Sequence, residues 1–159
     1  MNTLQNQGIS TTDILVIIDA QYGFIGYEHT RLIYNLVKYT KLFRDKGCHI
    51  CIVSYADCGL VLSGITDELT YYKNKSHIVK HRTSAGPYIL RQFSHLLPCG
   101  IKWHLIGVNW TQCLFQTAKD LVKAKQDVIV YKKASNPNHK RCPKIWEDLS
   151  INTNLTIVN

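Results

Sequence analysis

Residues 13–19 read DILVIID, and this stretch decides the fold class. The aliphatic run from Ile14 to Ile18 has no polar side, which is typical of a strand buried on both faces. Such strands belong to parallel sheets that helices cover on both sides. The run ends at Asp19, so a carboxylate is expected where the strand ends.

Outward from this strand, short apolar runs alternate with longer segments of helical periodicity. In the longest of these, Leu32, Leu36 and Phe43 fall on one stripe, and Gly47 ends the pattern. The predicted strands are 13–18, 48–54, 76–79, 102–106, 127–131 and 155–158, and the predicted helices are 29–46, 66–72, 87–97, 112–125 and 143–149. This alternation predicts an α/β fold with three αβα layers and a mainly parallel, six-stranded, Rossmann-like sheet.

The length of 159 residues fits one domain. We assign the polar residues 1–12 to a flexible leader and residues 13–159 to the domain. The longest apolar runs are far shorter than the roughly 18 residues of a membrane span, and the N-terminus lacks the order of a signal peptide. These features predict a cytoplasmic protein with no membrane contact, whose six cysteines are thiols. The formal net charge of +8 favours anionic small molecules as substrates.

Two further patterns have structural explanations. Cys48 and Cys51 resemble a metal-binding pair, but residues three apart in a strand face opposite sides, so we interpret both as core residues. The basic stretch from Lys132 to Lys144 has no RNA-binding signature and little aromatic interleaving. We therefore interpret it as a solvated surface and expect no nucleic-acid partner.

Three chemically active side chains follow different strands of the predicted sheet. Asp19 follows the first strand, Lys80 follows the third, and Cys113 begins the helix after the fourth. The carboxyl ends of parallel strands meet at the edge where α/β active sites lie, so we expect these residues to lie close together. A helix N-terminus and an ammonium both lower a thiol pKa, which favours Cys113 as a nucleophile and Asp19 as its base. Taken singly, a packed cysteine, a capping aspartate and a surface lysine remain alternatives.

Three sequence blocks carry a resemblance to a known family. They are LVIIDAQ with Phe24 (15–24), VKHRTSA (79–85) and IGVNWTQC (106–113), the last continuing through TAKD (117–120). In this order the chain resembles the isochorismatase-like cysteine hydrolase superfamily, which includes nicotinamidase and carbamoylsarcosine amidohydrolase. Each block is weak alone, and the three together are fairly specific.

The resemblance implies roles for individual residues. Cys113 would be the nucleophile, Asp19 the acid and base, and Lys80 the third member of a triad. It also implies a cis peptide between Val108 and Asn109, with the N–H groups of Asn109 and Cys113 holding an oxyanion. The implied reaction is hydrolysis of a carbon–nitrogen bond through a thioester.

Two departures from the family pattern change what we expect of the metal site and of the substrate pocket. Nicotinamidases bind a metal through Asp-x-His after the second strand, whereas Gly59 stands at the histidine position after Asp57. We therefore expect no metal and no cofactor. The family's lysine block usually continues with phenylalanine, and Gly86 at that position changes the expected pocket wall.

Phe24, Tyr55 and Trp110 are the candidates for the remaining pocket walls. For Trp110, packing under the nucleophile turn or at a subunit interface is an equal alternative. We expect a metal-independent hydrolase of small amide, ureido or carbamoyl compounds, and the resemblance implies a homodimer or larger homo-oligomer. The alternatives are an idle family member that serves as a small-molecule-binding or interaction module, and a nicotinamidase with an altered metal site.

Overall fold

A six-stranded sheet forms the middle layer of the structure, a computed structural model that describes residues 8–135 and 144–159. Every pairing between its strands is parallel, and the spatial order is β3-β2-β1-β4-β5-β6. The strands are β1 (Ile14–Ile18), β2 (His49–Tyr55), β3 (Lys75–Lys80), β4 (Lys102–Gly107), β5 (Asp127–Tyr131) and β6 (Leu155–Val158). All of β1 is buried, as the aliphatic run predicts.

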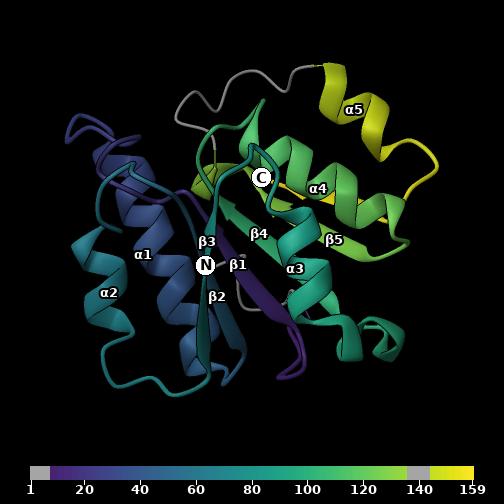
Figure 1. Cartoon of the computed structure of the whole chain (residues 1–159), viewed down its shortest axis with the longest axis horizontal. Helices are drawn as coiled ribbons and strands as arrows, with labels where there is room; N and C mark the ends of the chain where they lie inside the picture. Colours follow the sequence, from purple (N-terminus) through teal and green to yellow (C-terminus); the bar gives the residue numbers. More distant parts are fainter. Residues whose placement is uncertain (1–7, 136–143) are drawn as a thin grey trace.

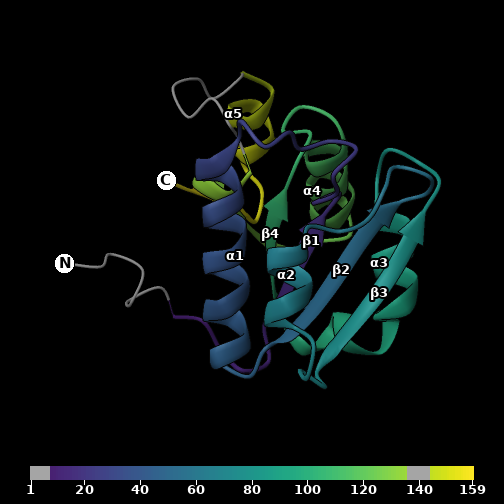
Figure 2. The same ribbon diagram turned by 90° about the vertical axis from the view of Figure 1, so that its left-hand side faces the viewer.

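Helices cover both faces of this sheet, so the predicted three-layer fold is confirmed (Figure 1). The helices are α1 (Thr30–Asp45), α2 (Ser63–Glu68), α3 (Gly86–Gln92), α4 (Cys113–Lys123) and α5 (Lys144–Ser150), with short 3-10 helices η1 (Ser94–Cys99) and η2 (Lys132–Ala134). In Figure 2 the molecule is turned by 90°, and α1 and α2 lie toward the viewer on one side of the sheet. Leu15 and Ile17 pack with this layer, whereas Val16 and Ile18 pack with α3, α4 and α5.

The sequence locates the strands better than the short helices. The predicted strands differ from the observed ones by at most one residue at either end. The predicted helix 87–97 is wrong in its second half, because the backbone of Phe93 (φ −107°, ψ 23°) leaves the helical region after α3 and Pro98 supplies no N–H. The predicted helix 66–72 begins earlier, after the extended residue Leu62 (φ −53°, ψ 130°).

Cys48, just before β2, and Cys51, within it, both lie in the core, as predicted. Cys48 packs in the cluster under α1, and Cys51 packs in the cluster on the opposite face. No helix in the described residues is both long and apolar enough to span a membrane. Much of the predicted leader (1–7) and of the basic stretch (136–143) lies outside the described ranges.

Candidate active site

Three strands bring Asp19, Lys80 and Cys113 together at the carboxyl edge of the sheet. Asp19 follows β1, Lys80 ends β3, and Cys113 begins α4 after β4. Lys80 Nζ lies 2.9 Å from Asp19 Oδ2, and Cys113 is close enough to this carboxylate to alter its pKa. Asp19 and Lys80 are fully buried, and Cys113 is 5% exposed. The three side chains that sequence analysis singled out therefore form one enclosed cluster.

Asp19 is held in an uncommon backbone conformation. Its φ is +53°, a left-handed value that costs free energy in a residue with a side chain. Its N–H donates to the carbonyl of Val53 at 2.9 Å, and its own carbonyl accepts from the N–H of Gln21 at 2.8 Å. These bonds turn the chain at the end of β1 and keep the carboxylate at the sheet edge.

The ammonium of Lys80 is fully paired, which its burial requires. Besides the ion pair, Nζ donates to the carbonyls of Arg82 and Thr83, both at 3.0 Å. The ring of Tyr55 lies against it, with Nζ 4.3 Å from the ring centroid. Two carbonyl acceptors, the ion pair with Asp19 and an aromatic face replace the water that the ammonium loses on burial.

The turn before Cys113 is built by two left-handed residues. Gly107 has φ +137°, and a Cβ there would lie 2.1 Å from the carbonyl oxygen of Ile18, so only glycine fits. Asn109 has φ +61°, and the N–H of Val108 donates to the Ile18 carbonyl at 2.9 Å. The expected cis peptide between Val108 and Asn109 is wrong, because no peptide bond in residues 8–135 is cis and the two positive φ angles reverse the chain instead.

Backbone N–H groups are available beside the thiol. The carbonyl of Asn109 accepts from the N–H groups of Gln112 (2.8 Å) and Leu114 (3.3 Å), which closes the turn onto α4. Within the described ranges, the N–H groups of Asn109 and Cys113 donate to no other residue. The side-chain amide of Asn109 lies 3.8 Å from Cys113 Sγ. The site can therefore offer free donors to an oxyanion.

The thiol is a weaker acid than the sequence suggested. Burial, followed by the hydrogen bond and charge of Asp19, raises the pKa of Cys113 to about 11, and Lys80 opposes this shift only in part. The expected lowering of the thiol pKa is therefore wrong. Burial also raises the pKa of Asp19, against the pull of Cys113 and Lys80. A protonated thiol thus lies beside a carboxylate whose basicity is increased.

Comparison with known proteins relates the chain to solved structures but to no known sequence family. No family model and no curated protein sequence matches the chain. Solved structures do match: nicotinamidase PncA from Bacillus subtilis has a TM-score of 0.75 at 14% identity, over 93% of this chain and 99% of that chain. N-carbamoylsarcosine amidase from Thermoplasma acidophilum has a TM-score of 0.69 at 21% identity, over 92% of this chain and 95% of that chain. The chain has the isochorismatase-like hydrolase fold.

The expected resemblance is thereby confirmed at the level of the fold. MAR1 ribonuclease from Caenorhabditis elegans shares this isochorismatase-like fold, with a TM-score of 0.75 and 17% identity over 95% of this chain and 78% of that chain. At these identities the likeness establishes the fold, and the site itself must support any activity.

The loop that follows Lys80 (residues 81–85) is hydrogen-bonded to α4. The N–H of Ala85 donates to Thr117 Oγ1 at 2.9 Å, and that hydroxyl donates to the carbonyl of Cys113 at 2.7 Å. The hydroxyl of Ser84 donates to Asp120 Oδ2 at 2.7 Å. The segment that holds the Lys80 ammonium is therefore fixed to the helix that carries the thiol.

Close packing between α3 and α4 explains why position 86 is a glycine. A Cβ at this position would lie 2.4 Å from the Cβ of Asp120. The close approach of α3 and α4 thus excludes a larger residue, including the phenylalanine expected from the family pattern.

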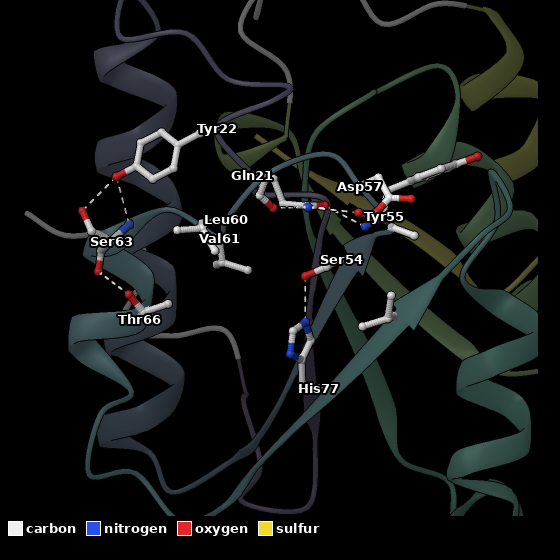
Figure 3. A pocket seen from close by; sticks show the side chains of 13 residues that line it. Gln21, Tyr22, Ser54, Tyr55, Asp57, Leu60, Val61, Ser63, Thr66 and His77 are labelled. Atoms are coloured by element: carbon white, nitrogen blue, oxygen red, sulfur yellow. Dashed lines mark hydrogen bonds between the residues drawn. The ribbon is translucent and has the colours of Figure 1, made fainter.

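A cavity of about 520 Å³ lies between α2 and the ends of β2 and β3 (Figure 3). Of the predicted wall residues, Tyr55 lines it, whereas Phe24 packs edge-on against the Tyr55 ring at 6.3 Å. Trp110 does not line it, because its ring stacks on Trp146 at 4.5 Å. None of the triad residues lines this cavity.

Several residues of this region have roles that the sequence alone does not indicate. Figure 3 shows Ser54 and His77 in the cavity, joined by a 2.7 Å hydrogen bond between Oγ and Nε2. The buried amide of Gln21 accepts from the N–H of Tyr55 (2.6 Å) and donates to the carbonyl of Gly59 (2.7 Å). Strand alternation could have placed Ser54 and His77 on one face, but no pattern in the sequence pairs them.

The loop after β2 contains the positions of the Asp-x-His metal motif, with Asp57 at the first position and Gly59 at the last. Asp57 and Gly59 both have positive φ, at 60° and 84°. In the described part of the chain, no three histidine, cysteine, aspartate or glutamate side chains are grouped so that they could hold a metal ion.

Proposed function

We propose that this chain is a cysteine hydrolase that cleaves a carbon–nitrogen bond of a small molecule. The observation that carries the proposal is the enclosed cluster of Asp19, Lys80 and Cys113, together with the N–H groups of the nucleophile turn that donate to no other described residue. Nicotinamidase and N-carbamoylsarcosine amidase, both of which act on such bonds by their names, share the fold.

The first step forms a thioester. Asp19 accepts the thiol proton of Cys113, and the sulfur attacks the substrate carbonyl carbon. The N–H groups of Asn109 and Cys113 hold the resulting oxyanion. The carbonyl re-forms, the carbon–nitrogen bond breaks, and protonated Asp19 gives its proton to the leaving amine.

The second step returns the enzyme to its resting state. Asp19 accepts a proton from water, and the oxygen attacks the thioester carbon. The carbon–sulfur bond breaks, the acid product leaves, and the proton returns to the Cys113 sulfur. Lys80 stabilises the carboxylate of Asp19 and the developing thiolate, because its ammonium lies beside both.

The surroundings of the triad favour a small substrate. Cys113 is only 5% exposed, so a large substrate would not reach the sulfur without opening the site. We propose amides, ureido compounds or carbamoyl compounds, with anionic members favoured by the net charge of +8. We further propose that the enzyme acts in the cytoplasm, without a metal or other cofactor, and as a homo-oligomer. The YcaC protein of Escherichia coli, an octameric hydrolase by its description, shares the fold (TM-score 0.71, 16% identity, 94% of this chain and 77% of that chain).

Release of ammonia from a panel of small amides, ureas and carbamoyl acids tests the proposal. Wild type is compared with Cys113→Ala and with Cys51→Ala, which alters a buried thiol of the core. Release by wild type and Cys51→Ala but not by Cys113→Ala supports the proposal. Equal release by all three contradicts it.

The same panel separates the alternatives. A nicotinamidase with an altered metal site would release ammonia from nicotinamide and lose this activity with a chelator. An idle binding module would release nothing and would bind small molecules unchanged after Cys113→Ala.

A further inference from the structure

Trp146 connects α5 to the nucleophile turn, although it lies far from Cys113 in the sequence. Its indole N–H donates to the carbonyl of Trp110 at 3.0 Å, and the two rings stack at 4.5 Å and 29°. The ring of Phe115 also packs edge-on against the Trp146 ring, at 5.1 Å and 83°. Trp146 is fully buried, and the proposed mechanism gives it no task.

The hydrogen bond from Trp146 fixes a peptide unit of the turn. The carbonyl of Trp110 and the N–H of Thr111 belong to one planar group, so holding the oxygen also sets the direction of the N–H. On the near side of this unit, the carbonyl of Asn109 is fixed by two N–H groups at the start of α4. Trp146 therefore supplies the second anchor of the segment between the proposed oxyanion donors.

We propose that Trp146 is a positioning residue that holds this turn in the geometry that stabilises an oxyanion. The inference rests on the proposed function, because it assigns the turn that role. A donor that stabilises an oxyanion must be placed within a fraction of an ångström. The Trp146 side chain acts only through the turn, and it need not contact the substrate.

Two reactions of the Cys113 thiol distinguish positioning from general structural support. In acylation by p-nitrophenyl acetate, the sulfur attacks the ester carbonyl, an oxyanion forms, and nitrophenolate leaves as the carbon–oxygen bond breaks. In alkylation by iodoacetamide, the sulfur displaces iodide and no oxyanion forms. The ratio of the two rates at Cys113, followed by peptide mass spectrometry, therefore reports on oxyanion stabilisation alone.

The variant is Trp146→Phe, which keeps an aromatic ring and removes the N–H donor. The matched control is Trp103→Phe, because Trp103 is also fully buried and its indole N–H donates to Gln126 Oε1 at 3.2 Å. Trp103 lies at the start of β4, opposite Ile14, whereas the turn follows the end of that strand.

We expect Trp146→Phe to lower the acylation rate about tenfold or more, as the loss of oxyanion donor geometry does in other hydrolases. Alkylation should change by less than about twofold, and Trp103→Phe should leave both rates near wild type. An unchanged acylation rate in Trp146→Phe, or a parallel change in both reactions, overturns the inference. A wild-type Cys113 that is alkylated but never acylated overturns the proposed function instead.

A second variant covers the case in which Trp146→Phe does not fold. Phe115→Leu removes the aromatic ring that packs against Trp146 and leaves the Trp146 N–H donor in place. The same selective loss of acylation supports the inference, and an unchanged ratio of the two rates overturns it.

Discussion

The Nζ of Lys80 lies 2.9 Å from Oδ2 of Asp19, and both side chains are completely buried. Each charge depends on the other, because neither side chain is exposed to solvent that could replace its partner. Removing one partner of a buried pair typically costs about 3–5 kcal/mol of stability.

We therefore predict that Lys80→Met lowers the free energy of unfolding by about 3–5 kcal/mol, because it leaves the Asp19 carboxylate buried and unpaired. Adding Asp19→Asn should recover part of this loss, since the second change removes the orphaned charge. Denaturant unfolding of the two single variants and the double variant measures the coupling. Strictly additive losses would show that the pair is not coupled.

The base role of Asp19 predicts a change in the acidity of Cys113. The carboxylate contributes to raising the thiol pKa to about 11, so Asp19→Asn should lower the pKa of Cys113 below that of wild type. The pH dependence of Cys113 alkylation measures this pKa, and Cys58 in the same protein serves as an internal reference. A midpoint that does not move would contradict the contact between the two side chains.

The same pair predicts how the rate of hydrolysis depends on pH. Asp19 must be ionised to accept the thiol proton, and its pKa is raised by burial. The rate should therefore rise with pH through a value above the ordinary aspartate pKa of 3.8 and then level off. In Asp19→Asn the residual rate should keep rising with the thiolate fraction. A profile identical to wild type in that variant would remove Asp19 from the mechanism.

At the opposite end of the sheet, His104 predicts a pH-dependent stability. Its Nε2 lies 3.2 Å from Asp13 Oδ2 and its Nδ1 lies 2.8 Å from the Tyr131 hydroxyl. Burial lowers the pKa of His104 below its ordinary 6.5, so the unfolded chain binds a proton at mildly acidic pH more readily than the folded chain. The free energy of unfolding should fall as pH drops below about 6.5. His104→Phe should flatten this part of the curve, and an unchanged slope would contradict it.

Gly86 gives a steric prediction. A methyl group there meets the Cβ of Asp120, so Gly86→Ala should cost about 1–3 kcal/mol of stability and lower activity by moving α3 away from α4. Gly8→Ala is the control, because no atom lies within 4 Å of a Cβ at that position. Thermal unfolding of both variants makes the comparison. A Gly86→Ala protein as stable as the control would show that the two helices separate freely.

The sequence alone was enough to identify the site residues whose positions depend on the order of the strands. Because β1 is uniformly aliphatic and the sheet is parallel, the ends of the strands could be located, and with them Asp19, Lys80 and Cys113. The order of the three sequence blocks, which resembles that of a known family, supported the choice of these residues. These predictions needed only local patterns and one topological rule.

What the sequence could not predict depends on contacts between distant segments. Trp146 lies under the turn because α5 packs there, and nothing near it in the chain indicates that position. The thiol pKa of Cys113 rises because burial and Asp19 outweigh Lys80, and this balance requires the packed structure. The 108–109 peptide has the trans geometry that is ordinary for a non-proline bond, and the cis bond was expected only from the family resemblance.

In the proposed mechanism, the sulfur of Cys113 carries the acyl group during hydrolysis of an amide. The most direct test quenches wild type with acid during turnover of the panel compound that it hydrolyses fastest, and then maps the chain by peptide mass spectrometry. We predict an acyl group on Cys113 alone and no turnover by Cys113→Ala. Turnover with no acyl group on Cys113, turnover that survives Cys113→Ala, or no turnover of any compound would contradict this mechanism.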